Sequence, residues 1–201
     1  MIRSLFTIVC LCLFITGCTY PHYVYKVESI EQWKRSPVAQ RGYVYLSGDV
    51  TSDKASNVVN KMVVLNDSEN VERIRLVIST TGGKQQALNT IINQITKSDK
   101  PVDIICIGSC YGTGIVLYAA ATGKRYAFPN TDFIMHRGKS NNKKAEVEKV
   151  LQFESEKYET LLKENSDLPD KLFPLEKKWI FFTDKEAKKY NMTDEIITEM
   201  P

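Results

Sequence analysis

The sequence predicts an α/β fold, because short apolar strands alternate with amphipathic helices along most of the chain. Residues 73–80 and 102–107 are rich in β-branched and apolar side chains, which is typical of buried strands. Between them, apolar residues recur from Leu88 to Ile95 at the spacing of one helix face. Strand, helix and strand in this order favour parallel strands joined by right-handed crossovers.

The first half of the chain contains elements at short intervals. Residues 43–46 are expected to form a strand that ends at Gly48, and residues 55–65 are expected to form a helix. The helix over 84–97 ends before Pro101, because proline lacks the amide that a helix interior needs.

The second half begins with a glycine-rich segment, 108–114, which we expect to be a turn. Residues 115–121 are apolar on every side, so this helix should be central, with Gly123 at its C-cap. The remaining elements are strands at 124–128 and 133–136 and a long charged helix at 143–164. The apolar residues of that helix are expected to form one seam: Val147, Val150, Leu151, Tyr158, Leu161 and Leu162.

Composition excludes several classes of protein. The chain has 201 residues, a formal net charge of +3 and 43% apolar residues, so it is neither disordered nor collagenous. A charge of +3 gives no electrostatic case for binding nucleic acid. The sequence has no Walker loop and no cluster with zinc-ligand spacing, so we expect neither cofactor nor metal.

The first 17 residues are predicted to be a signal peptide, since Arg3 precedes an apolar run that is too short to span a bilayer. Residues 15–18, Ile-Thr-Gly-Cys, resemble the bacterial lipobox, which implies cleavage before Cys18 and attachment of acyl chains such as palmitate to it. By resemblance to proteobacterial lipoproteins, Thr19 rather than Asp after Cys18 implies the periplasmic side of the outer membrane in a Gram-negative host. An ordinary signal peptide that contains a cysteine is the alternative.

After the leader, residues 18–40 are expected to form a lipidated N-terminus and tether, and residues 41–201 the folded domain. The domain keeps two cysteines, Cys106 and Cys110, which could pair in an oxidising compartment. If Cys106 lies in a strand, however, four extended residues hold the two too far apart. We therefore expect Cys106 to be buried and unpaired.

Two glycine-rich turns, 81–83 and 108–114, each follow a buried strand and open a helix. Backbone N–H groups at such positions lack helical partners and point outward, and two that converge would form an oxyanion hole. Each turn alone would only indicate a tight connection.

Together with later segments, these turns resemble the Clp protease proteolytic subunit family. The segments that carry the resemblance are 78–83, 108–114, 123–130, 134–136 and 182–194. The resemblance covers about residues 41–196. It implies an α/β fold of the ClpP/crotonase type, a superhelix of β-β-α units with a projecting long helix that makes oligomer contacts.

In that family a Ser attacks the scissile carbonyl, a His takes its proton, an Asp orients the His, and backbone amides hold the oxyanion. The resemblance implies that Gly83 and Thr113 lie at the oxyanion hole and that His136 is the catalytic His.

Two members of this triad have no equivalent side chain here. The nucleophile position falls on Gly112, or on Tyr111 if an alignment gap is placed earlier, and neither residue can replace Ser. The Tyr111-Gly112 pair also resembles the non-catalytic Clp subunits of plastids. The Asp position falls on or near Trp179, and the nearest acid is Glu176.

Three functional interpretations follow. The first is a lipid-anchored pseudo-protease that binds peptides along a strand or assembles with partners. The second is an active hydrolase with a rebuilt nucleophile, Cys110 or Ser109, acting with His136, because residues 108–112 also match the G-x-S-x-G pattern with Cys110 at its centre. The third, a crotonase-type acyl-thioester enzyme, is the weakest, since the turns contain no convincing acid–base pair of carboxylates.

Partners follow from the same resemblance. It implies a homo-oligomer formed through the long helix, with a dimer and a hexameric ring both open. Secretion would separate the chain from ATP, which argues against an AAA+ ATPase partner. The expected partners are therefore a membrane, a peptide or protein ligand, and further copies of the chain.

Overall fold

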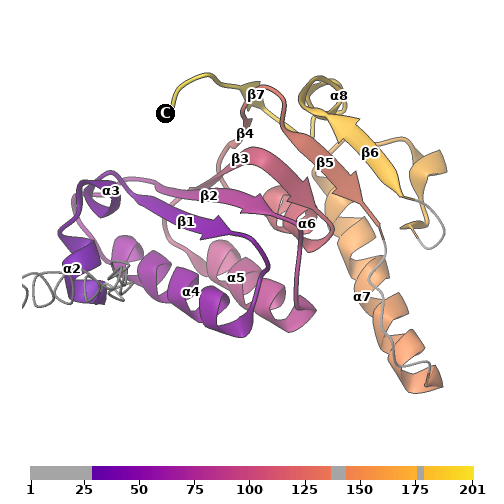
Figure 1. Ribbon diagram of the computed structural model, residues 1–201, viewed down its shortest axis with the longest axis horizontal. Coiled ribbons are helices and arrows are strands. Elements are labelled where there is room, and N and C mark those ends of the chain that lie inside the picture. The colour runs from indigo at the N-terminus through magenta and orange to yellow at the C-terminus, as the bar shows by residue number, and fades with distance from the viewer. Residues whose placement is uncertain (1–28, 137–143, 176–178) are drawn as a thin grey trace, which may run out of the picture.

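The computed structural model describes residues 29–136, 144–175 and 179–201, and its fold is α/β, as predicted (Figure 1). The strands are β1 (Tyr43–Ser47), β2 (Ile74–Thr80), β3 (Val102–Tyr111), β4 (Arg125–Ala127), β5 (Asp132–Met135), β6 (Ile180–Thr183) and β7 (Glu195–Ile196). The helices are α2 (Ile30–Lys34), α3 (Pro37–Gln40), α4 (Ser52–Asn66), α5 (Gln85–Lys97), α6 (Thr113–Ala119), α7 (Ala145–Glu164) and α8 (Asp184–Lys189), with a 3₁₀ turn at Asp170–Leu172.

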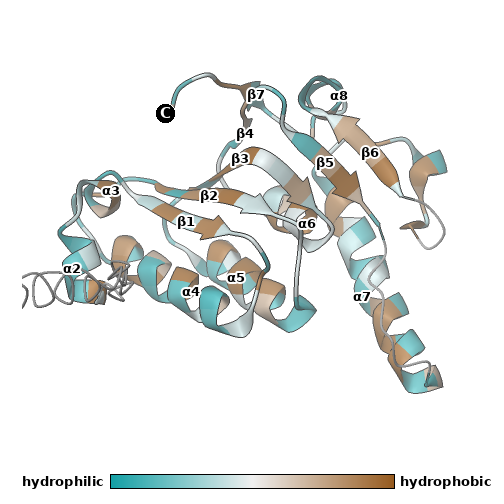
Figure 2. Ribbon diagram, viewed as in Figure 1, coloured by the Kyte–Doolittle hydropathy of each residue, from teal (hydrophilic) through white to brown (hydrophobic). Residues whose placement is uncertain are grey.

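A mostly parallel sheet lies at the centre, with its strands in the order β1-β2-β3-β4-β7. The long strand β3 pairs with β4 along its first half and with β5 along its second half, and β6 pairs antiparallel with β5. In Figure 2 the sheet is largely brown, whereas α4 alternates between brown and teal, as expected of a helix with one buried face. Because β2 and β3 are parallel, the turns that follow them lie at the same edge.

A bulge in β3 corrects the prediction about the cysteines. Ile78 of β2 pairs with Cys106, yet two residues later Thr80 pairs with Cys110, so β3 uses four residues where β2 uses two. The positive φ of 73° at Gly108 accommodates this bulge. It brings the two cysteine Cα atoms to 6.4 Å, and a buried disulfide joins them. The prediction of an unpaired Cys106 is wrong because it assumed a regular strand.

Helix α6 is central, as predicted, and its residues from Gly114 onward are buried. Gly114 packs so tightly that a methyl group on it would lie 2.5 Å from Cγ2 of Thr80. Gly123 is not the C-cap, which is Ala120. Its lack of a side chain serves packing instead, because a methyl group there would lie 2.2 Å from Oδ1 of the buried Asp103.

Helix α7 projects from the body of the molecule (Figure 1). Its buried residues are Leu151, Ser155, Tyr158 and Leu162. Val150 is 57% exposed, so the predicted apolar seam is buried only in part. Phe153, which is not part of that predicted seam, is 66% exposed. The projecting part therefore presents apolar side chains to solvent.

Residues 29–40 already pack on the domain. Ser29 caps α2, and Trp33 belongs to the main hydrophobic core with 5% of its surface exposed. Cys18 and the predicted leader lie outside the described residues. Among the described residues, no helix is long and apolar enough to cross a membrane, and no cluster of His, Cys, Asp or Glu could hold a metal ion.

The Arg125–Asp194 ion pair joins the C-terminal segment to β4, and we predict that Asp194→Asn destabilises the fold. Arg125 donates from its backbone amide at 2.7 Å and from Nη2 at 2.9 Å. Partial burial raises the pKa of Asp194, but these hydrogen bonds and the Arg125 charge outweigh it, so the net pKa is lowered. Because the pair is partly exposed, we expect a loss of about 1–2 kcal/mol at pH 7 in urea unfolding.

A lowered pKa in the folded state means that the stabilisation exists above the ordinary carboxyl pKa and is lost as the pH falls through the folded value. The difference between the wild type and Asp194→Asn should therefore shrink in acid. An equal difference at pH 7 and at pH 2.5 would contradict this role of the charge.

Candidate functional site

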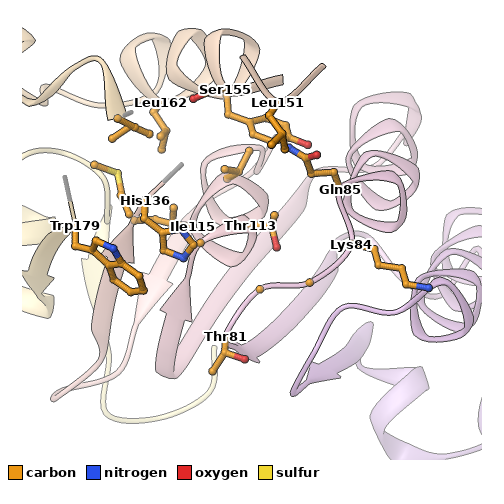
Figure 3. A pocket seen from close by; sticks show the side chains of 17 residues that line it. Thr81, Lys84, Gln85, Thr113, Ile115, His136, Leu151, Ser155, Leu162 and Trp179 are labelled. Atoms are coloured by element: carbon orange, nitrogen blue, oxygen red, sulfur yellow. The ribbon is translucent and has the colours of Figure 1, made fainter. Parts of the chain in front are cut away.

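A cavity of 470 Å³ lies where the turns after β2 and β3 meet (Figure 3). It is lined by the turn before α5, the start of α6, the end of β5, one face of α7 and the segment that enters β6. Five of the residues singled out from the sequence line it together: Gly83, Gly112, Thr113, His136 and Trp179.

Gly112 lies at the N-cap of α6 with φ 53° and ψ −116°, a conformation that strongly favours glycine. Its amide donates to the carbonyl of Ile134 at 2.8 Å, which ties this turn to β5. A methyl group on Gly112 would lie 3.2 Å from Nε2 of His136 and 3.5 Å from its Cε1. A side chain at this position would therefore point at the imidazole. Tyr111, the other candidate position, does not line the cavity.

The imidazole of His136 stacks on the indole of Trp179, with ring centroids 4.4 Å apart and planes 26° from parallel. Trp179 in turn stacks with Phe181, and both aromatic side chains are more than half exposed. The position at which the resemblance places the triad Asp is therefore occupied by the indole ring of Trp179, which lies beside His136. Glu176, the nearest acid in the sequence, lies outside the described residues.

Gly83 forms a free backbone edge beside the cavity. The Val50 amide donates to the Gly82 carbonyl, and the Lys84 amide donates to the Val50 carbonyl, so Gly83 is bridged to Val50 as in a parallel ladder. In such a ladder the N–H and C=O of Gly83 point away from Val50. Neither group has a hydrogen-bond partner among the described residues.

Close packing requires glycines in this turn. A methyl group on Gly83 would lie 2.4 Å from the carbonyl oxygen of Val50. One on Gly82 would lie 3.1 Å from Oγ1 of Thr113, a buried hydroxyl without a hydrogen-bond partner in the described part of the chain. The turn after β2 therefore packs closely against both the segment after β1, at Val50, and the start of α6.

The far wall of the cavity is apolar, and sequence reasoning did not assign it to the site. Ile115 and Val116 come from α6, and Leu151 and Leu162 come from α7. Burial, aided by the Glu154 carboxylate, raises the pKa of Tyr158, so its hydroxyl stays protonated and donates to Oδ1 of Asn89 at 3.3 Å. The predicted seam of α7 was the available signal, but the sequence did not indicate what that seam faces.

The two alternative nucleophiles do not reach this cavity. Cys110 is fully buried and bonded to Cys106, so it carries no thiol. Ser109 lies in β3, paired with Asp132 of β5, and does not line the cavity.

Comparisons with known proteins identify a family for this chain. The family described as Clp protease matches residues 29–200. The ATP-dependent Clp protease proteolytic subunit of Deinococcus radiodurans is 28% identical over 165 residues, which cover 78% of this chain and 80% of that relative.

Proposed function

This chain belongs to the Clp protease family, and from that premise we propose that it is a lipid-anchored, non-catalytic member that binds extended peptides. The observation that carries the proposal is Gly112. It faces Nε2 of His136 from the position that the resemblance assigns to the nucleophile, and it has no atom that could attack a carbonyl.

Trp179 adds to this argument. In a complete triad, a carboxylate holds the imidazole in the tautomer that accepts the nucleophile's proton. Here the ring stacked on His136 is an indole, which cannot stabilise an imidazolium as a carboxylate does. A disulfide also removes Cys110 from the possible nucleophiles.

Peptide binding needs none of the missing groups. An extended peptide can pair with an exposed backbone edge, and pockets beside that edge then select its side chains. The unpaired N–H and C=O of Gly83 offer such an edge, and the apolar cavity next to it offers such a pocket. Both features remain when the nucleophile is absent.

The proposed location, the periplasmic side of an outer membrane, rests on two independent features. The lipobox-like residues before Cys18 imply cleavage and acylation. The Cys106–Cys110 disulfide suits an oxidising compartment, because such bonds are rare in the cytosol. Two or more acyl chains would anchor the chain stably, at about 0.8 kcal/mol for each buried CH₂.

Self-association is the remaining part of the proposal. Members of this family form oligomers, and Val150 and Phe153 on the projecting part of α7 are exposed apolar side chains that a second copy could cover. The relative is named an ATP-dependent subunit, but a chain secreted into the envelope would be separated from ATP, so the proposal includes no ATPase partner.

We predict that the full chain, purified in detergent, does not react with a fluorophosphonate probe, whereas Gly112→Ser reacts slowly. The new hydroxyl would face Nε2 of His136, but with an indole where the family places the orienting Asp we expect a rate roughly 10⁴-fold below that of a complete triad. Labelling is measured by intact mass spectrometry.

Gly112→Ala is the matched control, since it carries the same backbone strain without a hydroxyl. Reaction of the wild-type chain would contradict the non-catalytic proposal. Failure of correctly folded Gly112→Ser to react, even after long incubation, would contradict the nucleophile position.

For the anchor, cells grown with radiolabelled palmitate should incorporate label into the wild-type chain and none into Cys18→Ala. Cys10→Ala, which changes a cysteine inside the leader, is the control and should keep the label. Label retained in Cys18→Ala would contradict lipidation at this residue.

Light scattering of the detergent-solubilised chain should give a mass above that of one copy. Replacing Phe153 by Asp should lower that mass, because it places a charge on the exposed apolar surface of α7. Thr160→Asp, on the same helix, is the control. A monomeric wild-type chain would contradict self-association.

A further inference from the structure

We propose that the cavity binds peptides by their C-terminal end, with a free carboxylate beside His136 and an apolar last side chain in the pocket. This inference rests on the proposed function and names the class of peptide that the site takes.

The first argument is the space that Gly112 leaves. The position of its missing side chain lies 3.2 Å from Nε2 of His136 and 3.7 Å from the carbonyl oxygen of Thr81. An attacking hydroxyl would occupy this place in a cleaving relative. Without it, a peptide that ends at this point can direct a second oxygen toward the imidazole. A terminal carboxylate has that oxygen, whereas an internal peptide bond does not.

The second argument is the charge of the lining. Among the described residues that line the cavity, none is Asp or Glu, while Lys84 and His136 are basic. Figure 3 shows that the Lys84 side chain points away from His136, so it contributes a positive field rather than a contact. Three neighbouring carboxylates contact lining residues: Asp49 accepts from Thr81 Oγ1, Glu159 accepts from the Leu175 amide, and Glu154, which also accepts from Asn89 Nδ2, lies beside the Tyr158 hydroxyl. An anion therefore meets a lining that carries no negative charge of its own.

The third argument is the backbone N–H of Gly83, a hydrogen-bond donor at the edge of the cavity. The N–H of Gly83 has no partner among the described residues and points away from Val50. Gly83 is exposed, so a ligand can reach this amide. A hydrogen bond from an amide to a carboxylate is stronger than one to a neutral carbonyl, so this donor favours a terminal carboxylate over an internal carbonyl.

The fourth argument is the depth of the pocket. Ile115, Leu151 and Leu162 line its wall, and its volume of 470 Å³ lies within the range of ligand pockets. A large aliphatic side chain next to the carboxylate would bury apolar surface there. The ligand class is therefore a peptide that ends in a residue such as leucine, with its terminal carboxylate free.

The test compares fluorescein-labelled pentaalanyl-leucine as the free acid and as the C-terminal amide, by fluorescence anisotropy with the full chain in neutral detergent. We expect the acid to bind at least tenfold more tightly than the amide. In Gly112→Ala the added methyl group fills the space beside His136, so the ratio of the Kd of the amide to the Kd of the acid should fall toward one. Ser109→Ala lies outside the cavity and should keep the preference.

The outcomes separate this inference from the function on which it rests. Equal binding of acid and amide by the wild-type chain would overturn the carboxylate inference and leave peptide binding standing. Binding of neither peptide, nor of an unfolded protein such as reduced casein, would overturn both. Displacement of the peptide by N-acetyl-leucine at equal concentration would show that the site takes small carboxylic acids rather than peptides, and would overturn the peptide class.

Discussion

The site depends on one constraint, which is the close approach of three backbone segments at the carboxyl edge of the sheet. The backbone at Val50, after β1, lies against the Gly82-Gly83 turn that follows β2, and the start of α6, after β3, lies against the end of β2. These approaches leave no room for a side chain at Gly83 or Gly114. Methyl groups on Gly83 and Gly114 would lie within 2.5 Å of neighbouring atoms. Because of this packing, the unpaired backbone groups of Gly83 and the backbone of Gly112 both line the same cavity.

Under our proposal, the glycines that keep this geometry also explain how the chain could bind a ligand without cleaving it. A groove needs backbone edges and apolar walls, and both come from the fold. Cleavage needs particular side chains in addition, and in our proposal these are the side chains replaced by Gly112 and Trp179. Binding and chemistry therefore rest on different residues, so one can be lost while the other persists.

The fold and the turns that form the site could largely be predicted from the sequence. The periodicity of the strands and helices predicted the α/β fold, and the glycine motifs predicted which turns would meet. The bulge at Gly108 could not be predicted, because strand patterns do not show where pairing loses register, and the disulfide depends on that bulge. The contact between Trp179 and His136 and the cavity wall supplied by α7 were also out of reach, since both depend on how distant segments pack.

The most direct test of the central claim follows one peptide and the protein together by hydrogen exchange and mass spectrometry. The full chain is incubated with a leucine-ended peptide carrying several internal peptide bonds. Our account predicts slower exchange in residues 81–85 and 112–116 while every peptide molecule stays intact. Peptide fragments that accumulate with time and disappear in His136→Ala would contradict it.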